Sequence, residues 1–166
     1  NGASEDSLPP EPLPNFDASI EQYEAIIAQH SSYPRLSEVL FKLGDGLIRA
    51  GRPDDGIPKL RLLTQTYPES TYLDVAYLSL AEYYFEKRNT AFAQEFYGKI
   101  VTDFPKSKVY NYAQYKLGWT YFNLGDTEGF QDAIKTFRQV VDYLDTQYAK
   151  CIDKTTLVLD ENCLPK

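Results

Sequence analysis

The chain has 166 residues, the size of a single domain, and 43% of them are hydrophobic, which is enough to build a core. Its formal net charge of −7 excludes the class of proteins that grip nucleic acid phosphates, because that binding depends on Lys and Arg. No apolar run approaches the ~18 residues that a membrane-spanning helix needs.

Residues 1–14 are rich in proline and acidic side chains, a composition that favours extended, solvated chain over a packed core. We interpret them as an acidic, Pro-rich linker between the folded part and a membrane anchor or another domain. A cloning remnant explains the first few positions equally well. Because the chain begins with Asn rather than Met, we expect a mature or excised fragment.

Residues 15–34 carry apolar side chains at the spacing of one helix face. We expect Asp17 or Ser19 to cap the start of this helix, because both side chains can accept a backbone hydrogen bond. Pro34 disfavours helical geometry in the residue before it and so ends the segment. The segment is predicted to pack on the N-terminal end of the remaining helices.

Leu43, Leu80 and Leu117 recur every 37 residues, and each is followed by a small residue. A period of this length is typical of a solenoid of helical hairpins, in which each repeat buries the apolar face of its neighbour. The pattern predicts three hairpins, with helices over 36–50 and 54–67, over 71–87 and 90–104, and over 107–124 and 128–146.

Pro58 complicates the second helix of the first hairpin, because proline has no N–H to donate. Two arrangements are open. Either the helix starts late, with Asp54 or Asp55 as its cap and Pro58 in its first turn, or the helix is kinked at Pro58. We favour the late start.

The second helix of the third hairpin is displaced, because its core positions trail those of the second hairpin by 40 residues rather than 37. Ala133 follows Ala93 at that distance, for example. Three residues have therefore been inserted around 127–129. We expect a longer turn between the two helices to absorb them, since loops tolerate insertions at little cost.

Small residues stand where the two helices of each hairpin should cross, and a proline closes the first two repeats. This constellation resembles the tetratricopeptide repeat family over residues 37–145, although Gln114 stands where a bulky apolar residue is usual. The resemblance implies an all-α fold, a right-handed α-α superhelix of three helical hairpins plus an N-terminal packing helix. The crossing pairs are Gly44 with Gly56, Ala81 with Ala93 and Gly118 with Ala133.

The 37-residue step and the Pro-x-Ser sequences at 68–70 and 105–107 are similar to repeats of bacterial cell-envelope proteins. These include outer-membrane assembly lipoproteins, Tol-Pal accessory proteins and gliding-motility tetratricopeptide proteins. The resemblance implies a periplasmic or outer-membrane-associated scaffold. A disulfide between Cys151 and Cys163 would fit that compartment, and two unpaired thiols are the alternative.

The expected organisation is therefore a linker followed by one repeat domain over 15–147 and a C-terminal tail. The parts are the linker at 1–14, the packing helix at 15–34, repeats at 35–70, 71–106 and 107–147, and the tail at 148–166.

In such a stack the first helix of each hairpin lines the concave face. Its non-core positions here are largely aromatic, and aromatic side chains carry much of the energy of protein interfaces. We therefore predict a groove for a protein or peptide segment that is apolar or, because of the acidic residues, basic. The predicted partner-binding residues are Phe41, Asp45, Leu78, Glu82, Phe85, Tyr112, Tyr115, Trp119 and Phe122. Alternatively, the tail or a further repeat covers Trp119 and Phe122.

Catalysis and cofactors are not expected. The sole histidine, His30, lies near no carboxylate or nucleophile motif, and the sequence contains no P-loop, GxSxG or HExxH pattern. We therefore predict a non-enzymatic scaffold without metal or cofactor. Two other functions fit the same residues: a structural module that stacks in a longer solenoid or on a second copy, and a groove that binds peptidoglycan or another glycan. The oligomeric state stays open.

Overall fold

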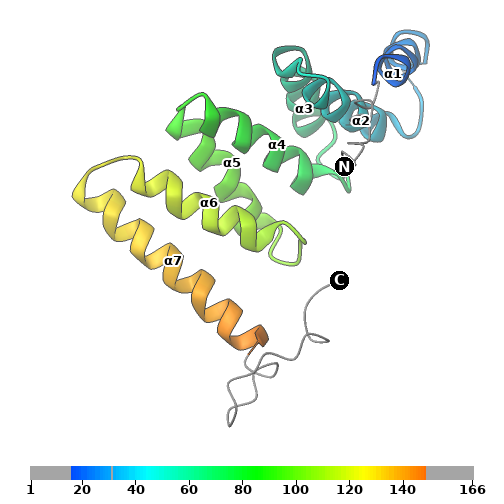
Figure 1. Cartoon of the computed structure of the whole chain (residues 1–166). Coiled ribbons are helices and arrows are strands. Elements are labelled where there is room, and N and C mark those ends of the chain that lie inside the picture. Colours follow the sequence, from blue (N-terminus) through cyan, green and yellow to red (C-terminus); the bar gives the residue numbers. More distant parts are fainter. Residues whose placement is uncertain (1–15, 31, 149–166) are drawn as a thin grey trace, which may run out of the picture.

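The computed structural model describes residues 16–30 and 32–148, and within these ranges the chain forms seven α-helices and no strand (Figure 1). This confirms the predicted helical-hairpin solenoid. Both cysteines and residues 1–14 lie outside the described residues. Helix α1 (Asp17–Gln29) precedes three hairpins, made of α2 (Leu36–Arg49) with α3 (Pro53–Thr66), α4 (Leu73–Glu86) with α5 (Thr90–Asp103), and α6 (Tyr110–Phe122) with α7 (Thr127–Tyr148).

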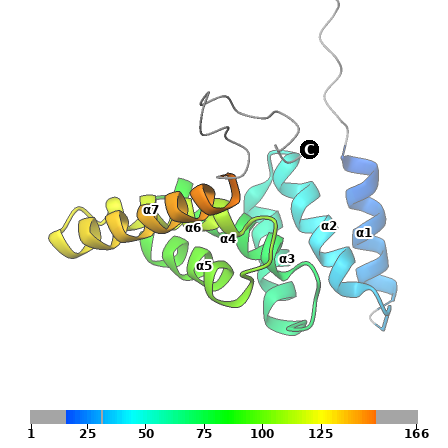
Figure 2. The same ribbon diagram turned by 90° about the horizontal axis from the view of Figure 1, so that it is seen from below.

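The helices pack in chain order. Each hairpin is closed by contacts between its two helices, and successive hairpins are joined through α3 with α4 and through α5 with α6. Helix α1 packs on α2. Figures 1 and 2 show α1 and α7 at opposite ends of the array. No helix within the described ranges combines the length and apolar character needed to cross a membrane.

The core follows the predicted repeat. Leu43, Leu80 and Leu60 are fully or almost fully inaccessible to solvent. The crossing of α2 and α3 depends on two glycines, because a Cβ on Gly56 would lie 2.6 Å from the backbone oxygen of Gly44. Only residues without a side chain allow the two backbones to approach so closely.

The late start expected for α3 is wrong. The helix begins at Pro53, its first residue, where a missing N–H removes no intrahelical bond. Pro58 lies inside the helix and leaves the carbonyl of Asp54 without its usual donor. Burial of Leu60 and Leu63 holds the segment helical, since tertiary packing contributes more to helix stability than local preference does. Asp55 accepts a hydrogen bond from Arg52 at 3.0 Å rather than capping the helix.

The expected cap of α1 is also wrong. Phe16 occupies the N-cap position, no side chain in the described part caps it, and its carbonyl accepts the Ile20 N–H at 2.9 Å. Asp17 therefore stands in the first turn, where a negative charge is favoured by the helix dipole.

The three inserted residues lie in helix α7 rather than in a turn, which corrects the prediction. Helix α7 begins at Thr127, 37 residues after the start of α5, and the turn before it, 123–126, is only one residue longer than the turn at 87–89. Three residues turn a helix by about 300°, so the core face returns almost to its former direction. Asp126 stabilises the new first turn by accepting the Gly129 N–H at 2.7 Å.

Candidate protein-interaction site

Aromatic rings gather on the outer side of the third hairpin. Trp119 of α6 lies 5.5 Å from Phe122 and 5.6 Å from Phe137 of α7, measured between ring centroids, and Phe122 lies 5.3 Å from Phe130. Tyr115 joins the group at 6.0 Å from Phe137. With Ile134 and Val141, which continue the apolar stripe of α7, we call these residues the aromatic end face: Tyr115, Trp119, Phe122, Phe130, Ile134, Phe137 and Val141.

Helical spacing explains why these side chains share a surface. Tyr115, Trp119 and Phe122 stand at i, i+4 and i+7 on α6, so they lie along one side of the helix. The buried residues of α6, such as Ala113 and Leu117, occupy the opposite side. The α7 residues of the end face repeat the same spacing from 130 to 141.

The end face consists of large apolar side chains that water reaches. Exposed fractions are 43% for Tyr115, 38% for Trp119 and 46% for Phe122. On α7 they are 40% for Phe130 and 54% for Ile134. A contiguous exposed apolar patch on a folded protein is a candidate interaction surface.

The same repeat positions are more enclosed in the earlier hairpins. Phe41, which precedes Tyr115 by two periods, stacks on the Tyr72 ring at 5.0 Å, and Tyr72 leads directly into α4 of the next hairpin. Phe85, one period before Phe122, is half-buried, with Lys116 of the next hairpin 4.1 Å from its ring centroid. The end face is therefore the third copy of a surface that twice carries a following hairpin, and no described hairpin follows α7.

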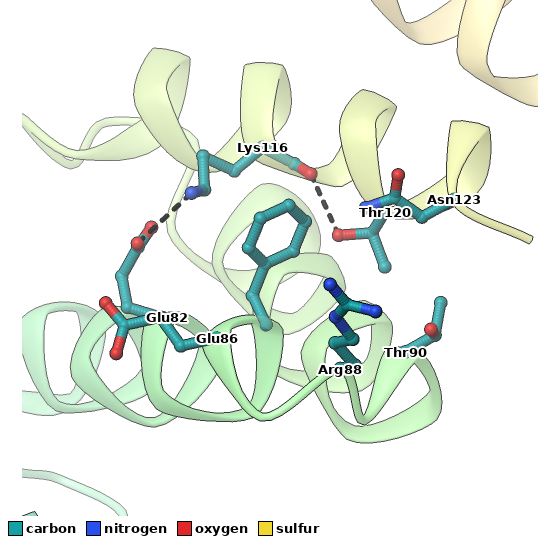
Figure 3. A pocket seen from close by; sticks show the side chains of 8 residues that line it. Glu82, Glu86, Arg88, Thr90, Lys116, Thr120 and Asn123 are labelled. Carbon is teal, nitrogen blue, oxygen red and sulfur yellow. Dashed lines mark hydrogen bonds and ion pairs between the residues drawn. The ribbon is translucent and has the colours of Figure 1, made fainter.

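A charged cleft lies beside the end face, between α4 and α6 (Figure 3). It has a volume of about 640 Å³. The Lys116 Nζ atom lies 3.2 Å from the Glu82 carboxylate and over the Phe85 ring, so this cation joins the second hairpin to the third. We call this space the α4/α6 cleft, which is lined by Glu82, Phe85, Glu86, Arg88, Thr90, Lys116, Thr120 and Asn123.

Glu82 is held by two partners. Besides the ion pair with Lys116, its carboxylate accepts a hydrogen bond from the Tyr97 hydroxyl at 2.5 Å. Burial, together with this carboxylate, raises the pKa of the Tyr97 phenol above its ordinary value. Partial removal of the phenol from water also raises the pKa of Tyr112, although much of the ring is exposed, and Glu82 contributes further. The Glu82 charge is therefore largely compensated within the protein.

Asp45 is compensated as well, because the Arg49 Nε–H donates to its carboxylate at 2.7 Å. Glu86, which lies one turn after Glu82 on α4, is exposed and has no ion pair within the described residues. The predicted surface is thus less acidic than its sequence indicates.

The predicted site residues fall into three groups. Tyr115, Trp119 and Phe122 lie together on the aromatic end face, with the exposed Tyr112 on the same helix. Glu82 and Phe85 lie together in the α4/α6 cleft. The others are half-buried side chains of the earlier hairpins, namely Phe41, Leu78 and Asp45. Binding by any of them stays a prediction.

Sequence reasoning missed the contribution of α7 to the end face. Phe130, Ile134, Phe137 and Val141 recur at helical spacing, and this stripe is wider than one core contact requires. That excess could have revealed the surface. No three His, Cys, Asp or Glu side chains in the described ranges are grouped closely enough to hold a metal ion.

A comparison with models of known protein families identifies a match. A family model described as YfiO, outer membrane lipoprotein, matches residues 16–162, which is most of the chain. No curated protein matches the chain.

Proposed function

Because the chain belongs to the YfiO family of outer membrane lipoproteins, we propose that it is a non-catalytic scaffold that binds a helical segment of a partner protein on its aromatic end face. Membership of this family places the protein at the outer membrane of the bacterial envelope. It also confirms the envelope-lipoprotein part of the resemblance noted from the sequence.

The observation that carries the proposal is the difference in burial between equivalent positions. Phe41 and Phe85 are partly covered by the next hairpin, whereas Tyr115 and Phe122 are exposed at 43% and 46%. A surface that accepts a helix twice within the chain has the shape to accept one again. An amphipathic helix with apolar anchors at i, i+3 or i+4, and i+7 is the partner that fits such a surface.

The rings of the end face also suit binding energetically. Trp and Tyr bury a large rigid area and lose little conformational entropy on binding, so truncation of such a residue at the centre of an interface costs about 2 kcal/mol or more. Trp119 is in contact with Tyr115, Phe122 and Phe137. It is therefore the expected centre of the interface.

A second candidate function uses the same face for structural stacking. In that case a second copy of the chain, or further repeats of a longer solenoid, would cover the rings. The half-buried state of the equivalent positions in the first two hairpins favours this candidate as directly as it favours a separate partner.

Site-specific photocrosslinking in the bacterium of origin tests the proposal and separates the two candidates. A photoreactive phenylalanine is placed at Tyr115, at Ile134 or, as a control, at Tyr33, which is 40% exposed but lies near the other end of the array. We expect crosslinks to a different protein from positions 115 and 134, lost when Trp119→Ala is added, and none from position 33. Crosslinks between copies would support stacking instead. No crosslinks, or equal crosslinks from all three positions, would reject the site.

A further inference from the structure

Arg88 occupies a backbone position that is glycine in the other two hairpins. Gly51, Arg88 and Gly125 are spaced by 37 residues, each follows the first helix of its hairpin, and their φ angles are 77°, 56° and 77°. The turns also share their hydrogen bonds, since the Gly51 and Arg88 N–H groups each donate to the carbonyl three residues earlier at 3.0 Å. This left-handed conformation suits glycine and is disfavoured for arginine.

Packing gives no reason for a side chain at this turn. A Cβ on Gly51 or on Gly125 would meet no described atom within 4 Å, so glycine is present there for its backbone freedom alone. Within the described ranges, the Arg88 side chain makes no hydrogen bond or ion pair. The described part of the fold therefore keeps an unfavourable residue at this turn without using its side chain. Such strain is concentrated at functional sites.

The Arg88 side chain lines the α4/α6 cleft. Figure 3 shows its guanidinium extending from the end of α4 toward Thr120 on α6, while the Glu86 carboxylate is directed to the opposite side. Glu86 forms no ion pair with Arg88, and Glu82 is already paired with Lys116. Neither acidic residue of the cleft therefore neutralises Arg88.

We infer that Arg88 binds a single Asp or Glu side chain of a partner protein segment lying in the α4/α6 cleft. The inference rests on the proposed function of a protein-binding scaffold and adds a second contact beside the end face. A guanidinium offers parallel N–H donors that match the two oxygens of a carboxylate. The Asn123 amide and the Thr90 hydroxyl, which line the same space, supply further donors.

The cleft also limits what the segment can carry. Glu86 stands two residues before Arg88, is exposed and has no ion pair within the described residues, so its carboxylate would repel additional negative charge. The site therefore favours a segment with a single carboxylate over a segment with several. Apolar or neutral residues should flank that carboxylate, and the apolar ones would cover the Phe85 ring.

The test is a nuclear magnetic resonance titration of the ¹⁵N-labelled protein with three blocked peptides. The first is acetyl-Thr-Leu-Thr-Glu-Leu-Thr-Leu-amide, the second has Gln in place of Glu, and the third has Glu in place of every Thr. The observed signals are the Arg88 Nε–H and the Asn123 side-chain amide. We expect the single-Glu peptide to shift both signals at a concentration about tenfold lower than either comparison peptide does.

Variants separate recognition from general charge attraction. Arg88→Ala and Arg88→Gly should each weaken binding of the single-Glu peptide about tenfold, whereas Lys87→Ala, which removes the same charge from the adjacent residue, should change it by less than about twofold. Arg88→Gly should also raise Tm by about 2 °C because it relieves the backbone, and Arg88→Ala should not.

Equal binding of the Glu and Gln peptides, tighter binding of the acidic run, absence of binding at millimolar peptide, or an equal loss in Lys87→Ala would overturn the inference. The peptide titration tests the role of Arg88, whereas the crosslinks at Tyr115 test the proposed function, so either experiment can give a negative result without the other. Crosslinks without selective peptide binding would support the proposed function and reject the role of Arg88. Selective peptide binding without crosslinks would support the role of Arg88 and reject binding at the aromatic end face.

Discussion

Gly56 and Gly98 both lie inside helices, but the structure predicts opposite effects when each is changed to Ala. A Cβ on Gly56 would lie 2.6 Å from the backbone oxygen of Gly44 and 3.0 Å from a side-chain atom of Ile48. A Cβ on Gly98 would meet no described atom within 4 Å. The two variants thus apply the same Gly-to-Ala substitution at a close helix crossing and at an open position.

The magnitudes follow from two terms. Replacing glycine with Ala inside a helix stabilises the folded state by about 1 kcal/mol, because the unfolded chain loses conformational freedom. At Gly98 this term acts alone, so Gly98→Ala should raise the free energy of unfolding by about 0.5–1 kcal/mol. At Gly56 the backbone oxygen cannot move aside as a flexible side chain can, and overpacking costs about 1–3 kcal/mol. Gly56→Ala should therefore lower the free energy of unfolding by about 1 kcal/mol or more.

Urea denaturation followed by circular dichroism at 222 nm measures both changes. A change of 1 kcal/mol corresponds to about 4 °C in Tm for a folded body of this size, so thermal unfolding provides a second readout. A Gly56→Ala variant as stable as Gly98→Ala would refute the close helix crossing on which the repeat architecture rests.

Three further perturbations test individual interactions. In a double-mutant cycle of Lys116→Ala and Glu82→Gln, we expect a coupling free energy of about 1 kcal/mol, because the 3.2 Å pair is partly screened by solvent; additive effects would show that the pair does not join the hairpins. Because the folded state raises the pKa of Tyr97 above 10.0, the unfolded chain loses its proton first. Stability is therefore unaffected by this group below pH 10 and falls above it, and urea titrations at pH 8 and pH 11 should show a smaller fall in Tyr97→Phe than in wild type. Asn89 caps α5 by accepting the Phe92 N–H at 3.3 Å, so Asn89→Ala should cost about 1 kcal/mol in urea denaturation, and an unchanged midpoint would contradict the cap.

The sequence predicts the hairpins well because tight packing fixes a few residue types at fixed intervals. Leu43, Leu80 and Leu117 each stand beside a small residue, and a Cβ on Gly44 or on Gly118 would lie 2.6 Å from a side chain of the facing helix. Helix starts are less predictable. Asp17 and Asp55 are good capping residues, but α1 begins at Asp17 itself and α3 begins at Pro53, two residues before Asp55.

The candidate site was only partly predictable, for a different reason. Tyr115, Trp119 and Phe122 could be assigned to one side of a helix from their spacing alone. The compensation of Glu82 depends on Lys116, 34 residues later in the sequence, and on the way the second hairpin meets the third. Such contacts between hairpins leave no periodic trace in the sequence, whereas the replacement of a repeated glycine by Arg88 does leave one.

Trp119 is the only tryptophan of the chain, so its fluorescence reports directly on the aromatic end face. The most direct measurement is acrylamide quenching of this fluorescence, first in the dilute isolated protein and then in the complex captured by crosslinking at Ile134. An exposed aromatic end face predicts strong quenching of the isolated protein and clear protection in the complex. Weak quenching of the isolated monomer, which would mean that its own chain covers the ring, or equal quenching in both states, would contradict it.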